Sequence, residues 1–412
     1  APQPGAGKGA GRSGADGPHA GVRVERRTHR AGSRHSLLSY VSTADDLPAT
    51  AGSLLSFDMA AGHPGSVLKY VDKSLEEVPL IPSCIMKVYN ETEALVYKEL
   101  AATNDSLLPF VATFYGEVDP SELLVNPDCG RYMRLSNLVS DFDYNPHVMD
   151  CKLGVRSFSE EEVKQTKRRN DLYLRLLEMD PSVLTEEERR EEACTKFRWM
   201  EFNDRHTTMN EHGFRVDGIQ SSQGRTAKPR LWQMQNLQDV AQRIYEDFLP
   251  ASSSSPTASV KSWSPTNSSE NGKAGSSGLE ASDGDPHSPR TSPAPAAAAA
   301  VLRRLRAMRE AMEASKFVKS HTFIGCSLFF VSQTSGPSAG VFLIDFAHTT
   351  PVPEGIAIDH RSPWRLGNHE DGLLIGMDNM IRCWEEVVLL SSGGKPTDCV
   401  GGSDEFRQIM SI

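Results

Sequence analysis

Two side chains of opposite charge, Asp150 and Lys152, lie two residues apart in the stretch Pro146-His147-Val148-Met149-Asp150-Cys151-Lys152-Leu153-Gly154. In a β-strand, residues with this spacing point to the same face, about 6–7 Å apart. A carboxylate and an ammonium at that distance suit phosphoryl transfer. The acid can orient an attacking hydroxyl, and the lysine can neutralise charge on the moving phosphate. Asp150 and Lys152 are therefore candidate catalytic residues, and a surface ion pair in a turn is the alternative.

A third charged residue, Asp345, follows the apolar run Gly340-Val341-Phe342-Leu343-Ile344. A short apolar run bounded by glycine predicts a buried strand, with the acid at its end. An acid in that place can hold Mg²⁺ against the phosphates of ATP. We therefore predict ATP and Mg²⁺ as ligands of Asp345.

Two further segments have the composition of a nucleotide site. Lys87 lies among apolar neighbours with Glu93 shortly downstream, and a strand lysine held by a helix glutamate contacts nucleotide phosphates in kinases. Glycines in Gly62-His63-Pro64-Gly65-Ser66 would let backbone N–H groups approach phosphates closely. The alternatives are an edge-strand lysine and a plain hairpin turn. As candidate ATP-binding residues we take Lys87, Gly62, Gly65, Ser66, Glu93, Asn137 and Asp345.

Cations between residues 169 and 215 could bind a ligand with several phosphate groups, which needs several cationic partners around it. Solvated helices also carry lysine and arginine, so the group is a stronger signal than any one of its members. The candidates are Arg169, Lys196, Arg198 and Arg215.

The bulk composition excludes several classes of protein. The net charge of −10 gives no general attraction to nucleic acid or to a membrane surface. No apolar run reaches 18 residues, so we expect no transmembrane segment. The 7 cysteines are scattered without C-x-x-C spacing, which indicates reduced thiols and a cytoplasmic or nuclear protein.

Composition also divides the chain into parts. Residues 1–53 form a mostly disordered arm rich in small and polar residues, and residues 54–412 form the folded domain. Within that domain, residues 251–300 are of low complexity and are expected to be a disordered insert. The remainder predicts a mixed α and β fold, with strands at 55–70, 84–89 and 109–117 and helices at 91–101 and 371–390.

Two helix starts are marked between residues 159 and 205. Ser159 with Glu162, and Thr185 with Glu188, have the spacing of capping boxes. They predict one helix over 160–179 and a second over 186–200, which carry most of the candidate cations.

Taken together, these blocks resemble the inositol polyphosphate kinase family, and most closely its inositol 1,4,5-trisphosphate 3-kinase branch. The resemblance covers residues 54–390 except 251–300. It rests on Ala61–Ser66, Met149–Arg156, Gly325–Leu328 and Ile344–Phe346, and for the branch on Met179–Pro181, Leu184–Glu188, Gly213–Ile219, Pro363–Trp364 and Gly367–Gly372.

The resemblance implies an α+β, two-lobed kinase-like fold, with a small N-lobe sheet, a larger C-lobe and a helical substrate-binding insertion at 159–205. It implies transfer of phosphate from ATP to the 3-hydroxyl of inositol 1,4,5-trisphosphate, a step in inositol and calcium signalling. In that scheme Lys87 contacts ATP, Asp150 engages the hydroxyl, and Lys152 lies between substrate and γ-phosphate. Asp345 and Ser327 lie on the metal side, and Arg169, Lys196 and Trp199 line the substrate pocket.

The chain also departs from the family pattern. Ala347 and His348 replace a glycine and a lysine, Asn203 replaces an arginine, and Asn137 lies where an adenosine-binding carboxylate is usual. A broader inositol polyphosphate multikinase and a non-catalytic pseudokinase therefore stay open as alternatives. Calmodulin regulates animal members of the family, but residues 23–34 are basic without large apolar anchors and give that partner no support.

Overall fold

The computed structural model describes residues 53–56, 67–71, 84–118, 131–143, 145–249, 292–334 and 336–394. All of them belong to one compact unit that spans His35–Ile412. The predicted arm up to residue 52 and residues 250–291 lie outside the described residues. In the described part, no helix is both long and apolar enough to cross a membrane.

The first sheet is antiparallel and has the strand order β1-β2-β3-β5-β4. The region 55–70, where strands were predicted, carries the end of β1 and most of β2, and these two strands pair with each other. Helix α1 follows β3 and begins at an N-cap, where the Asn90 side chain accepts a hydrogen bond from the Glu93 N–H at 3.0 Å. The elements are β1 (Ser53–Ser56), β2 (Val67–Val71), β3 (Cys84–Val88), α1 (Glu91–Thr103), η1 (Leu108–Phe110), β4 (Phe114–Val118) and β5 (Tyr132–Ser136).

The second sheet is also antiparallel and has the strand order β10-β9-β6-β12-β13. Its central strand is β6, and all of that strand's residues are buried. The strands are β6 (His147–Leu153), β9 (Phe214–Ser221), β10 (Gly224–Arg225), β12 (Ser327–Ser332) and β13 (Ala339–Ile344). A separate pair joins β11 (His321–Phe323) to β14 (Thr349–Pro351).

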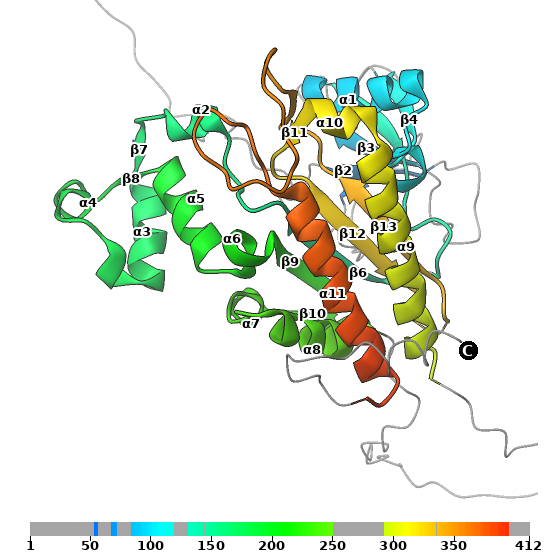
Figure 1. Cartoon of the computed structure of the whole chain (residues 1–412). Coiled ribbons are helices and arrows are strands. Elements are labelled where there is room, and N and C mark those ends of the chain that lie inside the picture. Colours follow the sequence, from blue (N-terminus) through cyan, green and yellow to red (C-terminus); the bar gives the residue numbers. More distant parts are fainter. Residues whose placement is uncertain are drawn as a thin grey trace, which may run out of the picture. The chain divides into compact units, whose positions relative to one another are not determined.

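Three long helices pack on this second sheet and on one another (Figure 1). They are α8 (Leu237–Asp247), α9 (Ala294–Ala314) and α11 (Leu373–Ser391). The shorter helices α6 (Thr208–His212), α7 (Lys228–Trp232) and α10 (Lys316–Ser320) each lie between a strand and another helix. Apolar side chains from both sheets and from the long helices form one continuous core. The fold is therefore α+β and kinase-like, with a five-stranded N-terminal sheet and a second five-stranded sheet on which the long helices pack.

Residues 160–205 form a small helical group with its own apolar cluster, at the left of Figure 1. Both predicted capping boxes are present, but the helices that they start are shorter than predicted. The reason is that Arg168–Arg169 and Cys194–Thr195 pair as strands, so the backbone must be extended at both places. The elements are α2 (Glu160–Val163), β7 (Arg168–Arg169), α3 (Asn170–Met179), η4 (Pro181–Val183), α4 (Glu186–Glu191), β8 (Cys194–Thr195) and α5 (Lys196–Arg205).

The predicted insert over 251–300 ends too late, because its last residues are helical. Helix α9 begins at Ala294 and continues for 21 residues. Alanine has the highest helix propensity, and its small side chain lets a helix approach a sheet closely. Ala297 and Ala298 are fully buried in the main core. The alanine run is therefore core sequence, and its low complexity was misleading.

A buried histidine joins three parts of this core. His360 Nδ1 lies 2.8 Å from the Asp371 carboxylate, and its Nε2 lies 2.8 Å from the Val318 carbonyl oxygen. Both partners can only accept hydrogen bonds while the acid is ionised, so both ring nitrogens must carry hydrogen. His360 is therefore an imidazolium, and Asp371 also accepts the Phe323 and Leu373 N–H groups at 2.7 and 2.9 Å.

We expect this ion pair to make stability depend on pH. Burial alone would lower the pKa of His360, but the bond to Asp371, with Glu370 nearby, outweighs burial and raises that pKa above its ordinary 6.5. A raised pKa in the folded state means that the stabilisation is complete below pH about 6.5 and is lost as pH rises through the folded pKa. The free energy of unfolding should then fall by at most about 1.4 kcal/mol per pH unit.

Urea unfolding at a series of pH values, for wild type and His360→Asn, measures this effect. Asparagine suits the position, because it tolerates the left-handed backbone that His360 adopts at φ 60. His147 and His321 have pKa values lowered by burial and so contribute the opposite slope in both proteins. Subtracting the two curves isolates His360, and identical pH slopes would contradict its assignment as a cation.

Candidate active site

Strand β6 carries both residues of the predicted catalytic pair. Asp150 is fully buried opposite Phe329 of β12, and Lys152 lies opposite Ser327 of the same strand. The Lys152 ammonium donates to the Gly325 carbonyl at 2.9 Å and to Ser327 Oγ at 3.0 Å. The strand prediction is confirmed, and the turn that a surface ion pair requires is excluded.

A second lysine comes from the first sheet and meets the same centre. Lys87 of β3 donates to Glu93 Oε1 at 2.7 Å and to Asp345 Oδ1 at 2.9 Å. Burial alone would lower the pKa of Lys87, but the carboxylates of Asp345 and Glu93 outweigh it and raise that pKa. Lys87 is therefore a fixed cation held by Glu93 of α1 and by Asp345, which directly follows β13.

Asp345 lies between the two lysines. Its Oδ2 is 3.7 Å from the Lys152 ammonium, and its Oδ1 contacts Lys87. Its backbone has φ 67 directly after β13, in a left-handed conformation that few residues other than glycine adopt. This uncommon backbone turns the carboxylate toward both cations, and such local strain is typical of functional sites.

The residues around Asp345 fit a divalent metal that arrives with a nucleotide. Oxygen donors are the ligands that Mg²⁺ prefers, and Mg²⁺ is usually held by one or two carboxylates together with substrate phosphates. Across the described ranges, no group of three or more His, Cys, Asp or Glu side chains could hold a metal by itself. Asp345 would therefore supply one carboxylate and the nucleotide the remaining oxygens, with the Ser327 hydroxyl bound to Lys152 beside it.

His348 approaches the centre from the loop after Asp345. It is half-buried, and the desolvation lowers its pKa, while charges on Glu162, Lys196 and Lys152 also act on it. Lys196 forms an ion pair with Glu162 across the helical group. Glu162 and Lys196 are therefore the charged residues of the helical group that act on His348.

The other predicted cations of the helical group make contacts inside it. Arg169 pairs with Asp171 through its Nε at 2.9 Å, and Arg198 donates to the Val183 carbonyl at 2.7 Å. Trp199 is buried in the group's own apolar cluster. The structure pairs Lys196 with Glu162 and places Arg169, Arg198 and Trp199 within the helical group.

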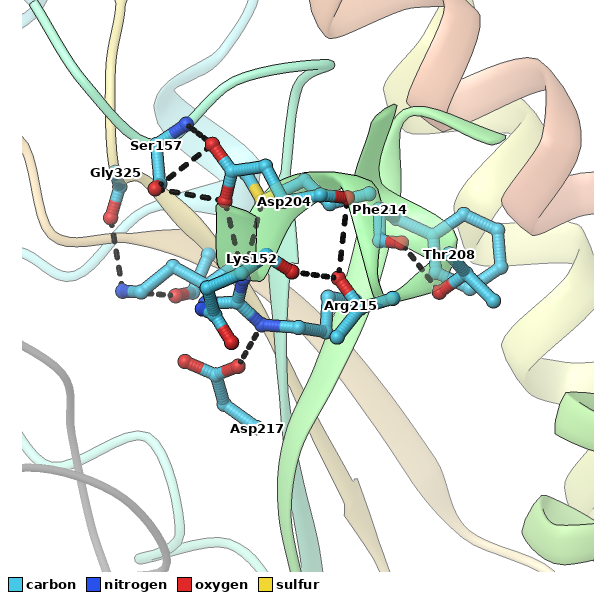
Figure 2. Close-up of polar contacts among 12 residues, drawn as sticks. Lys152, Ser157, Asp204, Thr208, Phe214, Arg215, Asp217 and Gly325 are labelled. Atoms are coloured by element: carbon cyan, nitrogen blue, oxygen red, sulfur yellow. Dashed lines mark hydrogen bonds and ion pairs between the residues drawn. The ribbon is translucent and has the colours of Figure 1, made fainter. Parts of the chain in front are cut away.

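Arg215 lies directly opposite Lys152 across the β6–β9 pair. Its guanidinium bonds to Asp217 Oδ1 at 2.6 Å and to Asp204 Oδ1 at 3.2 Å (Figure 2). Burial would lower its pKa, but these two carboxylates raise it well above the ordinary value. The charge of Arg215 is therefore compensated by two acids of the protein, Asp204 and Asp217.

Three predicted nucleotide residues, Gly62, Gly65 and Ser66, lie outside the described residues. Asn137 is buried directly after β5, on the segment that leads from the first sheet to the second, and its side chain accepts from the Val139 N–H at 3.3 Å. Its place between the sheets agrees with a hinge position.

Sequence reasoning missed several residues of the centre. His348 was noted only as a departure from the family pattern, although its place three residues after Asp345 was a usable signal. Gly325 entered as part of a motif, and the role of its carbonyl as an acceptor for Lys152 has no sequence signal. Asp204 and Glu162 looked like ordinary helix acids, because nothing local shows which acids are buried.

Comparison with known proteins gives this geometry a family. The model of the inositol polyphosphate kinase family matches residues 132–265 and 286–385, which is more than half of the chain. The chain belongs to this family. The matched part contains Asp150, Lys152, Ser327 and Asp345, while Lys87 and Glu93 precede it.

The curated relatives of this family member are inositol-trisphosphate 3-kinases. The chain is 32% identical over 325 residues to inositol-trisphosphate 3-kinase A of Homo sapiens, across 78% of this chain and 57% of that protein. It is 29% identical over 332 residues to the Caenorhabditis elegans homolog, across 79% of this chain and 54% of that protein. The chain thus spans little more than half the length of these relatives.

Among solved structures, the chain is similar to a crystal structure of the inositol phosphate multikinase Ipk2 of S. cerevisiae in complex with ADP and Mn²⁺. The sequence identity is 16%, the TM-score is 0.41, and the match covers 74% of this chain and 98% of that one.

Proposed function

We propose that this chain is an ATP-dependent kinase that phosphorylates the 3-hydroxyl of inositol 1,4,5-trisphosphate to give the 1,3,4,5-tetrakisphosphate. The observation that carries the proposal is the contact of Asp345 with both Lys87 and Lys152, which come from different sheets. The family membership and the names of the curated relatives support the substrate class.

Each residue of the centre has a role that follows from its contacts. Lys87, fixed by Glu93, would hold nucleotide phosphates at the first sheet. Lys152 would neutralise charge that develops on the transferred phosphate, because its ammonium is fixed by the Gly325 carbonyl and needs no rearrangement. Asp150, on the same buried strand, would orient the attacking hydroxyl and accept its proton.

Asp345 would hold the metal side of the nucleotide. Mg²⁺, when bound there, would supply positive charge between the phosphates. The protein's contribution is the fixed carboxylate and a buried surrounding, in which electrostatic interactions are stronger than in water.

A broader inositol polyphosphate kinase is the second candidate. It is favoured by the contacts of Arg169 and Arg198, which are made within the helical group. Fewer cations then remain to select one arrangement of phosphate groups on the substrate. His348 adds a cation only when protonated, and burial lowers its pKa. Such a site would select inositol phosphates less strictly than one lined by permanent charges.

Purified protein, Mg-ATP and a panel of inositol phosphates test the proposal. We expect the fastest turnover with inositol 1,4,5-trisphosphate, and phosphate on the 3-position of the product by two-dimensional NMR. Comparable turnover of inositol tetrakisphosphates would favour the broader kinase instead. Tight binding of the trisphosphate by calorimetry without any turnover would overturn both and indicate a binding protein.

A further inference from the structure

One carboxylate joins the two ends of the helical group. Asp204 is in the last turn of α5, where the group ends, and Ser157 lies just before α2, where it begins. Asp204 Oδ2 accepts the Ser157 N–H at 2.7 Å, and Oδ1 accepts the Ser157 hydroxyl at 2.8 Å (Figure 2). The side chain of Asp204 is almost fully buried, so these bonds are shielded from water.

The same carboxylate connects the helical group to the strand that carries Lys152. Asp204 Oδ1 accepts from Arg215 Nη1 at 3.2 Å, and Arg215 is the β9 residue paired with Lys152 of β6. Figure 2 shows the chain of contacts from Ser157 through Asp204 to Arg215 beside Lys152. Asp217 holds the other edge of the guanidinium through Nε at 2.6 Å, which fixes the arginine from two sides.

This connection matters because the helical group does not share the main core. Its buried apolar residues form a separate cluster that includes Leu172, Trp199 and Phe202. With a separate core, the orientation of the group depends on its contacts with the rest of the chain, which include these bonds of Asp204, the bonds of Glu160 to the Gly367 and His369 N–H groups and the packing of Phe197 on Phe158. Lys196 belongs to this group, where it pairs with Glu162, so its position relative to Lys152 depends on the same contacts.

We propose that Asp204 is a positioning residue, which sets the helical group against strand β6 so that a bound inositol phosphate is presented to Asp150 and Lys152. The proposal rests on the proposed function. Asp204 itself touches no reacting atom and acts through Ser157 and Arg215.

The charge of Asp204 is part of this role. Burial raises the pKa of Asp204 to about 6, although the Arg215 charge and the Ser157 hydrogen bonds favour the ionised form. The charged groups that face it are Arg215 and Asp217 of β9 and Arg156 beside Ser157. Below pH about 6 a proton would displace one of the donors, so the group should be held less firmly in mildly acidic solution.

The test compares Asp204→Asn and Ser157→Ala with wild type. The control is Glu201→Gln, another acid of α5, whose partner Arg205 is at the surface. We expect Asp204→Asn to lower kcat/KM for the inositol phosphate by about 10- to 100-fold while KM for ATP changes less than about twofold. The Ser157 variant should show a smaller loss in the same parameter, and the control should match wild type.

Two measurements separate positioning from general damage. Hydrogen exchange of the free proteins should show faster exchange of amides in 160–205 for Asp204→Asn, with the strands of the second sheet unchanged. The decline of wild-type kcat/KM below pH about 6 should be weaker in Asp204→Asn, because the amide cannot take up a proton.

The proposal would be overturned if Asp204→Asn lost kcat/KM equally for ATP and for inositol phosphate. It would also be overturned if hydrogen exchange of amides in 160–205 were unchanged. If Asp204→Asn does not fold, Ser157→Ala decides the question by the same two criteria. The exchange measurement uses no substrate. If the proposed function is wrong, the wild-type protein shows no turnover. If the positioning role of Asp204 is wrong, exchange in 160–205 is unchanged, so the two failures can be distinguished.

Discussion

Asp345→Asn should lower kcat by about 10³-fold or more, with the fold and the affinity for inositol phosphate retained. The carboxylate contacts Lys87 at 2.9 Å and Lys152 at 3.7 Å, and it is the oxygen donor best placed for a metal. An amide has nearly the same shape but no charge, so it would bind the metal weakly and leave both ammonium groups less compensated. Lys87 keeps its bond to Glu93, which should preserve the position of β3.

The measurement is steady-state turnover at saturating Mg-ATP, with calorimetry of inositol phosphate binding to show that the substrate site persists. Asp378→Asn is the matched control, because Asp378 also contacts two cations, Arg309 and Arg361, but at the partly exposed side of α11. The control should turn over like wild type. Equal turnover in both variants would remove Asp345 from the metal side of the site.

The sequence predicted correctly that Asp150 and Lys152 lie on a strand and that Asp345 follows one, because a short apolar run bounded by glycine indicates a buried strand. Asp150 and Lys152 belong to β6, and Asp345 follows β13, as the apolar runs indicated. Lys87 and Glu93 form an ion pair because helix α1 begins at Glu91, shortly after the end of β3. In each case the residues within a few positions in the sequence were sufficient to predict the strand or helix that carries the side chain.

The helical group shows where local patterns were insufficient. Capping boxes predicted where α2 and α4 begin, but pairing of β7 with β8 decided where those helices end. Tertiary pairing of this kind overrides helix propensity and has no local signature. The prediction that the alanine run of α9 is disordered was wrong because composition does not show that the run is buried in the core.

Arg215 shows the limit of the spacing argument. Arg215 and Asp217 stand two residues apart on β9, as Asp150 and Lys152 do on β6, and spacing alone cannot tell a structural pair from a reacting one. The distinction comes from the other groups that each cation contacts. Arg215 meets a second carboxylate, Asp204, which completes its neutralisation, whereas Lys152 meets a carbonyl, a hydroxyl and the more distant Asp345.

Lys152→Ala should lower kcat by about 10²- to 10³-fold, the range seen when one preorganised donor to a developing charge is removed. The ammonium is nearly buried and bonds to the Gly325 carbonyl and Ser327 Oγ at 2.9 and 3.0 Å, so no other cation can take its place without rearrangement. Binding of inositol phosphate should weaken as well. Lys152→Arg should restore little activity, because a planar guanidinium is larger and does not reproduce a compact point charge.

Steady-state kinetics of both variants, together with thermal melts, check this prediction. Lys319→Ala, at an exposed position of α10, is the matched control and should change neither turnover nor melting temperature. If Lys152 were a purely structural cation, its alanine variant would melt earlier but keep its kcat in the folded fraction. The reacting role requires the reverse, because no other group replaces the charge that Lys152 offers to a moving phosphate once its side chain is removed. Near-normal turnover in Lys152→Ala would therefore remove the residue from the mechanism, whatever its effect on stability.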